Sequence, residues 1–119
     1  MNNVVARSSA HFLKKSRDFA RVKREGHRRQ SPHFNLVYCS TESSDTRFGI
    51  VVGRRFGNSV KRNRAKRIVR DLVRTTREPF IPGKDCVVYP RRLLLETDHL
   101  DLKEAWLGIL GQERLIANR

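Results

Sequence analysis

Apolar residues recur at helical spacing in three stretches of this chain, and the longest predicts a helix over residues 58–77. Asn58 or Ser59 can cap this helix, and Pro79 lies just beyond its end. Its apolar stripe would consist of Ala65, Ile68, Val69, Leu72 and Val73. The opposite half of the helix carries mainly cations: Asn63, Lys66, Arg67, Arg70, Arg74 and Arg77. The helix is therefore predicted to be amphipathic, with a basic outer face.

Two further helices are predicted nearer the ends of the chain. Ser16 can cap a helix over residues 16–25, in which Phe19 shares a face with Val22. Gly26 is predicted to stop that helix in the left-handed conformation. A final helix starts near residue 97 or 98 and runs towards residue 116, with a buried stripe of Leu102, Ala105, Trp106, Ile109 and Leu110.

Three other apolar runs have the patterns of β-strands. Residues 34–39 and 47–53 alternate their side chains between two faces, and the polar cluster 40–45 between them predicts an antiparallel hairpin. Residues 86–89 are almost continuously apolar, which is typical of a strand inside a sheet. Residues 1–15 show no sustained period and are expected to form a loose arm. The order α-β-β-α-β-α favours an α+β domain with helices packed against a small sheet.

The composition is that of one small domain with a polyanionic partner. The 119 residues include 26 Lys and Arg against 12 Asp and Glu, a formal net charge of +14. Such an excess favours phosphates, which release counterions when Lys and Arg replace them. No run approaches the roughly 20 apolar residues of a membrane span, so we expect a soluble, cytoplasmic protein. Cys39 and Cys86 stand alone in apolar runs, which favours buried, reduced thiols over a disulfide.

The basic residues concentrate in one segment. Between Arg54 and Arg77, ten of 24 residues are Lys or Arg and only Asp71 is acidic. An ordinary charge run is a solvated helix face that mixes both signs. Here Lys66 and Arg70 stack like charges at i,i+4, which should cost a few tenths of a kcal/mol per pair unless a polyanion neutralises them. We therefore favour phosphate binding by this helix.

Catalysis by the protein itself has little support in the sequence. No acidic pair has the spacing of metal ligands, and the histidines lack oriented partners: His11, His27, His33 and His99. Neither cysteine has a neighbouring base. Most aromatics of the strands and turns are expected in the core: Phe34, Tyr38, Phe48 and Phe56. Phe19 lies on a short basic helix, where its ring could stack on a base at the rim of a cleft.

The segments 47–52 and 57–70 together resemble the signature of the bacterial ribonuclease P protein subunit, with Arg62-Asn63-Arg64 as its specific core. Upstream, Asp18-Phe19, Val22 and Gly26 are similar to the family's first helix, and residues 83–88 to one of its strands. The resemblance covers about residues 12–91.

The resemblance implies an α+β fold of the ribosomal-protein S5 domain 2-like type. It would have a small sheet of about four strands, three helices and a left-handed βαβ crossover, a handedness that is rare. It also implies a subunit that binds the catalytic RNA and the 5′ leader of precursor tRNA and assists endonucleolytic removal of the leader. The catalytic centre would lie in the RNA, magnesium would act with the RNA, and the protein alone would bind no cofactor, membrane or DNA.

The resemblance also assigns residues to the two RNA contacts. The set facing the catalytic RNA would be Arg54, Arg55, Asn58, Lys61, Arg62, Asn63, Arg64, Lys66, Arg67 and Arg70. The set that holds the leader would be Phe19, Lys23, Val37, Arg47, Gly49 and Val51. Lys23 and Val37 stand where family members often have aromatic residues, so charge or apolar contact would replace stacking at these positions.

Two alternatives follow from the residues. A ribosomal or other structural RNA-binding protein would share the basic face and take no part in hydrolysis. A helix-turn-helix DNA binder would need two adjacent helices joined by a short turn, and the strand at 86–89 argues against it.

Overall fold

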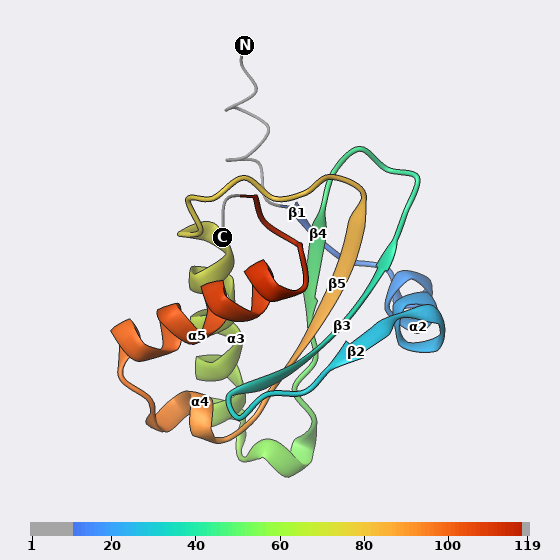
Figure 1. The fold of residues 1–119 in the computed structure, drawn as a ribbon. Helices are drawn as coiled ribbons and strands as arrows, with labels where there is room; N and C mark the ends of the chain where they lie inside the picture. Colours follow the sequence, from blue (N-terminus) through green and yellow to red (C-terminus); the bar gives the residue numbers. More distant parts are fainter. Residues whose placement is uncertain (1–10, 118–119) are drawn as a thin grey trace.

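The structure, a computed structural model, describes residues 11–117, which form short strands and helices (Figure 1). In chain order the elements are β1 (His11–Phe12), α2 (Ser16–Glu25), β2 (His27–Arg29), β3 (Phe34–Ser40), β4 (Arg47–Ile50), a 3-10 turn (Arg54–Phe56), α3 (Ser59–Arg74), β5 (Lys84–Pro90), α4 (Leu93–Glu96) and α5 (His99–Gln112). The predicted α+β class is confirmed. The described residues form five strands instead of about four, and the short α4 is an additional helix.

The strands form one mixed sheet in the order β1-β4-β5-β3-β2. The central strand β5 pairs antiparallel with β3 and parallel with β4, so that Cys86 lies opposite Tyr38 on one side and Phe48 on the other. The predicted hairpin between residues 34–39 and 47–53 is therefore wrong. The apolar run of β5 takes the central position and separates the two strands. α3 connects the parallel neighbours β4 and β5, as the resemblance implies for the crossover, whose handedness stays a prediction.

Both edges of the sheet are strands that the sequence pattern did not predict. β1 is two residues long and pairs parallel with β4, and Leu13 after it is buried. Residues 11–15 are therefore not a loose arm, and residues 1–10 lie outside the described part. At the other edge, β2 pairs antiparallel with β3 and exposes His27 and Arg28. Strands of two or three residues carry too few side chains to show alternation.

The helices lie on the two faces of the sheet (Figure 1). α3 and α5 cover one face, where the main core includes Phe34, Phe48 and Trp106. The Trp106 indole Nε1 donates to Thr76 Oγ1 at 3.0 Å, which satisfies the one polar atom of this large side chain. α2 covers part of the other face, where Val22 packs with Leu13, Val37 and Val87 in a second, smaller cluster.

The helix ends agree only partly with the predicted caps. Asn58 caps α3, and its side chain accepts a hydrogen bond from Lys61 N at 3.0 Å. Ser16 does not cap α2, because Lys15 is the cap residue. Gly26 has φ −79° instead of the left-handed conformation. A glycine is nevertheless required there, since a Cβ atom would lie 2.5 Å from Val22 O. α3 and α5 also end three and four residues before the predicted limits at residues 77 and 116.

Candidate nucleic-acid interface

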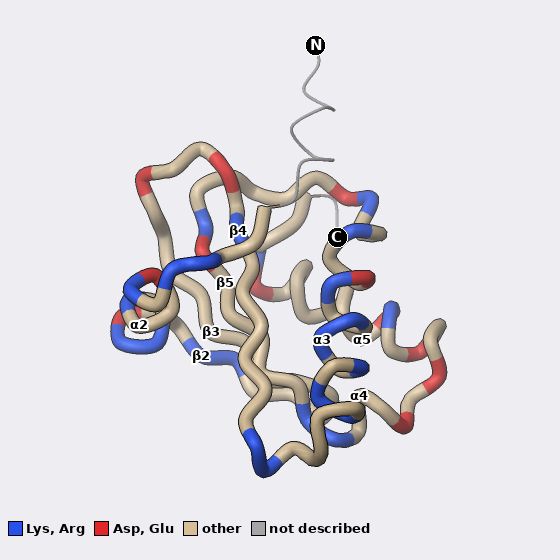
Figure 2. The backbone as a smooth tube through the Cα atoms, turned by 180° about the vertical axis from the view of Figure 1, so that it is seen from behind, with Lys and Arg blue, Asp and Glu red and all other residues tan. Residues whose placement is uncertain are grey.

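Lys and Arg residues recur along α3, beside the sheet (Figure 2). Its buried residues are Ala65, Val69, Leu72 and Val73, so the predicted apolar stripe is confirmed except that Ile68 is only half-buried. The remaining side chains of the helix include the predicted RNA-facing residues. Those that are exposed are Lys61, Asn63, Arg64, Arg67 and Arg70, and Lys66 is half-buried. Arg74 extends the row, and its guanidinium lies 5.6 Å above the Phe12 ring of β1.

Arg62 differs from its neighbours on α3. Its Nη1 donates to Gly57 O at 2.6 Å, and the side chain is half-buried. Gly57 has φ 156°, which favours glycine, in the turn that leads into the helix. Arg62 therefore stabilises the entry to α3. The exposed Arg54 and Arg55 lie in the preceding 3-10 turn, where Arg55 O accepts a hydrogen bond from Arg92 at 2.9 Å.

Phe19 brings the two predicted sets of RNA contacts together. Its half-buried ring lies against the backbone of Gly49, where a Cβ atom would overlap it. A groove of about 290 Å³ runs beside this contact. Its walls come from β1, α2, β4 and α3: Phe12, Leu13, Lys14, Phe19, Phe48, Gly49, Ile50, Lys66 and Arg70. Phe19 of the predicted leader set therefore lines the same groove as Lys66 and Arg70 of the predicted RNA-facing set.

Beyond the end of α2, the same face of the sheet is open. Val51 is 37% exposed, and Tyr89 is half-buried. Both line a shallow depression with Arg55 and Arg91. Tyr89 is not expected at an open surface from the sequence, because the apolar run that it ends indicates a core strand. Its position directly before Pro90, near the end of the strand, is the signal in the sequence for an open surface, because helices cover the ends of a strand less often than its middle.

A second cleft of about 210 Å³ lies next to Tyr89, at the β2 edge. Lys23 from α2 lines it together with Arg28, Gln30 and Asn35. Asn35 Oδ1 is buried there and has no hydrogen-bond partner in the described part of the chain. Lys23 of the predicted leader set thus lies at the open sheet face, beside Arg28, Gln30 and Asn35, which the sequence did not single out.

Two residues of the predicted leader set, Val37 and Arg47, have side chains that are buried or paired within the protein. Val37 is 1% exposed and packs in the cluster beneath α2, so its side chain is largely covered by that helix, and its contact with a leader stays a prediction. Arg47 donates from Nε and Nη2 to Asp85 at 2.9 and 2.7 Å. The alternation of β3 and β4 places both residues on the correct face, but α2 covers that part of it.

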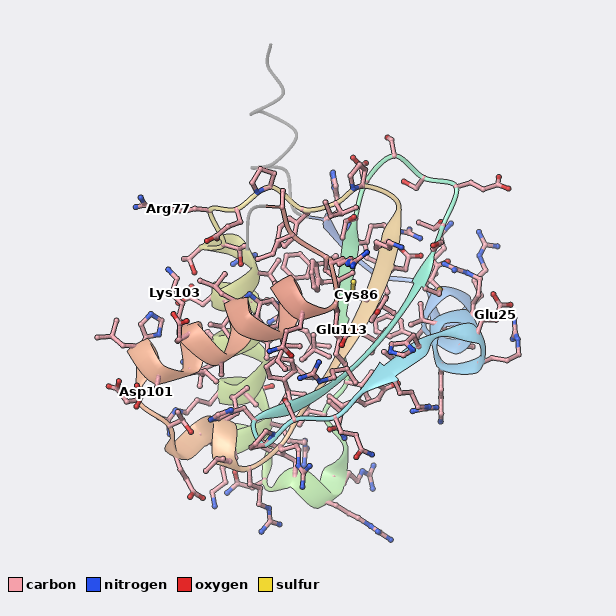
Figure 3. The ribbon with its side chains drawn as sticks, in the orientation of Figure 1. Glu25, Arg77, Cys86, Asp101, Lys103 and Glu113 are labelled. Atoms are coloured by element: carbon pink, nitrogen blue, oxygen red, sulfur yellow. The ribbon has the colours of Figure 1, made fainter. Side chains whose placement is uncertain are left out.

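The two cysteines, Tyr38 and Glu113 are buried or hydrogen-bonded within the fold. Burial raises the pKa of Cys86, which lies in the middle of β5 (Figure 3), and of Cys39, and both cysteines are free. Burial and a hydrogen bond to Glu113 Oε1 at 2.6 Å raise the pKa of Tyr38 to about 12. Glu113 also accepts from Arg29 at 2.8 Å, so that the end of α5 is tied to the β2–β3 edge.

Neither a metal site nor a membrane span is found in the described residues. Within residues 11–117, no group of three or more His, Cys, Asp or Glu side chains could hold a metal ion. None of the described helices combines the length and the apolar character that crossing a membrane requires.

Comparisons with known proteins point to one family. Residues 8–113 match the family described as Ribonuclease P. The chain is 34% identical over 92 residues to the ribonuclease P protein component of Desulforapulum autotrophicum, an alignment that spans 77% of this chain and 79% of that protein. The RNase P protein from Thermotoga maritima has the same fold with a TM-score of 0.74 and 33% identity, over 86% of this chain and 96% of that one. The Staphylococcus aureus RNase P protein matches with a TM-score of 0.78 and 27% identity, over 91% and 99% of the two chains. The chain therefore belongs to the family of bacterial ribonuclease P protein components.

Proposed function

We propose that this chain binds the catalytic RNA of ribonuclease P with the exposed face of α3 and holds the 5′ leader of precursor tRNA in the adjoining groove. The observation that carries the proposal is the groove in which the Phe19 ring lies beside Lys66 and Arg70. An aromatic face with cations at its rim suits a single strand, because bases stack on the ring while cations follow the phosphates. The protein thereby favours precursor over mature tRNA, which lacks the leader.

The leader would continue from Phe19 across the open sheet face. Val51 and Tyr89 offer an apolar and an aromatic surface there, and Arg55 and Arg91 supply charge. Lys23 lies at the neighbouring cleft. A single strand held in this way makes few contacts that depend on base identity, because every base has a stacking face. We place the catalytic centre in the RNA subunit, together with the magnesium it needs.

A cleavage assay tests the function directly. Precursor tRNA is incubated at low magnesium with the cognate RNA subunit, with this protein, or with both. We expect 5′ processing to be fastest with both, because the cations of the protein reduce repulsion between the two RNAs. Clean 5′ processing by RNA-free protein would contradict the proposal. Recovery of ribosomal RNA alone in a pulldown would favour the structural RNA-binding alternative.

Charge removal from α3 tests the surface. Arg64→Ala and Arg67→Ala should each lower the salt slope of RNA-subunit binding by about 0.7 to 0.9 units, because each removes one phosphate contact. Lys103→Ala is the matched control, because it removes the same charge from α5 (Figure 3). Equal slopes for all three variants would show that RNA binds elsewhere. Arg62→Ala should lower the melting temperature as well as the salt slope, because Arg62 donates a hydrogen bond to Gly57 O.

A further inference from the structure

Four charged side chains form a closed cluster, here called the α2 clamp, between α2 and the sheet. Asp18 and Arg21 come from α2, Arg47 from β4 and Asp85 from β5. Asp85 accepts from Arg47 at 2.9 and 2.7 Å and also pairs with Arg21 Nη2. Asp18 closes the cluster, because its carboxylate lies 3.6 Å from Arg21 Nη2 and 3.7 Å from Arg47 Nη1. Each charge therefore lies between two charges of opposite sign.

The carboxylate of Asp85 is the buried centre of the clamp, with 0% of its side chain exposed. Burial alone would raise the pKa of Asp85, but the hydrogen bonds from Arg47 and Arg21 outweigh it and hold the pKa below its ordinary value. A buried carboxylate with two guanidinium partners is strongly destabilised when either partner is lost. Arg47 thus directs two of its donors, and Arg21 one, to a carboxylate inside the protein.

The clamp lies beside the contact that forms the groove. Asp18 precedes Phe19 on α2, and Arg21 follows two residues later. Arg47 precedes Gly49 by two residues on β4, so both face the same side of the sheet. The clamp therefore fixes the same parts of α2 and β4 that bring the Phe19 ring against Gly49.

We propose that Asp18, Arg21, Arg47 and Asp85 are positioning residues for the precursor tRNA leader, which hold Phe19 at the groove without contacting the leader phosphates themselves. This inference rests on the proposed function, because it concerns the residues that hold the proposed leader groove in its binding geometry. It changes the role that the resemblance implies for Arg47 from direct binding to positioning.

Removal of an acidic residue separates positioning from charge. In a protein of net charge +14, loss of a carboxylate should leave RNA binding unchanged or tighten it, if electrostatics alone decides. The proposal requires instead that loss of either carboxylate of the clamp, Asp18 or Asp85, weakens binding of precursor tRNA. Glu42 provides the matched control, because this exposed residue of the β3–β4 loop changes the net charge by the same amount.

The experiment measures how tightly the reconstituted holoenzyme binds precursor tRNA with a leader of several nucleotides, and mature tRNA. Loss of a base-aromatic stack corresponds to a roughly five- to 150-fold loss of affinity. We expect Asp85→Asn and Asp18→Asn to weaken precursor binding within this range and to leave mature tRNA and RNA-subunit binding unchanged. Glu42→Gln should weaken neither. Arg47→Lys keeps the charge but not the paired hydrogen bonds, so it should also weaken precursor binding.

Phe19→Ala separates failure of the clamp inference from failure of the proposed leader groove. If Phe19→Ala weakens precursor binding while both aspartate variants behave like Glu42→Gln, the clamp inference is overturned and the leader groove stands. If Phe19→Ala has no effect on precursor binding, the leader groove and the clamp inference both fail. Equal losses for precursor and mature tRNA would also overturn positioning, because they indicate general loss of structure. Should Asp85→Asn not fold, Asp18→Asn and Arg47→Lys decide, since the Asp18 contacts are longer and partly exposed.

Discussion

A methyl group at residue 49 tests the contact between Phe19 and the sheet. In an ordinary strand, Gly→Ala stabilises by about 0.5 to 1 kcal/mol. The Cβ atom of Gly49→Ala would instead overlap the Phe19 ring and lie 3.2 Å from Leu13 Cδ1. Overpacking of this kind costs about 1 to 3 kcal/mol. We therefore expect Gly49→Ala to lower the free energy of unfolding by about 1 kcal/mol, measured by urea denaturation.

The double variant with Phe19→Ala gives the sharper measurement. Phe19 is half-buried, so Phe19→Ala alone should cost about 2 kcal/mol, roughly half the loss for a fully buried Phe. Without the ring the new methyl group has room, and the two losses should fall short of additivity by about 1 to 3 kcal/mol. Gly53→Ala is the control, because nothing lies within 4 Å of its Cβ position. Additive losses for Gly49→Ala and Phe19→Ala would show that the ring does not lie on Gly49.

Three other substitutions test the scaffold by urea denaturation. Tyr38→Phe removes the donor to Glu113 and should cost about 1 to 2 kcal/mol. The pKa of Tyr38 is raised to about 12, so its contribution to the free energy of unfolding is complete below the ordinary tyrosine pKa of about 10. That contribution is lost as the pH rises through about 12. An equally steep loss of stability at alkaline pH in Tyr38→Phe would contradict this. Gly108→Ala lies in α5 with open space at its Cβ position and should stabilise by about 0.8 to 1 kcal/mol; destabilisation would mean that this side of α5 is covered. Gly26→Ala should destabilise by about 1 to 3 kcal/mol, because its Cβ would lie 2.5 Å from Val37 Cγ1; an unchanged stability would show that the chain shifts freely there.

The three longer helices could be predicted from the sequence because their signals are local. α3 has an apolar stripe along its 16 residues and the Asn58 cap directly before them, and α2 begins and ends at the predicted residues 16 and 25. The order of the strands depends on contacts far apart in the chain. Residues 34–39 and 47–53 are joined by a turn-forming segment, yet β5, more than 30 residues later, lies between them. Local turn chemistry cannot show that a more apolar strand will take the central place.

The interface was predictable to the extent that it lies on one helix. Arg64, Arg67 and Arg70 point away from a stripe that the sequence shows, so their exposure follows from helical geometry. For a strand, alternation shows which residues share a face but not which helix covers that face. Val37 is covered by α2 and Tyr89 is not, although both lie on the same side of the sheet. Alternation therefore cannot show that Val37, which the resemblance assigns to the leader set, is covered, or that Tyr89 is open.

The arginines of this protein differ in what their donors contact, and this difference decides their role more than their number does. Repulsion along the cations of α3 costs about 0.2 to 0.5 kcal/mol per i,i+4 pair. Burial of one Val or Leu side chain contributes about 1.5 to 3 kcal/mol, and α3 buries Val69, Leu72 and Val73. The helix can therefore keep its cations unneutralised and available to phosphates. In the α2 clamp, by contrast, Arg21 and Arg47 pair with Asp18 and Asp85 inside the protein. In the role that we propose for the clamp, the same residue type serves the shape of the groove instead of its charge.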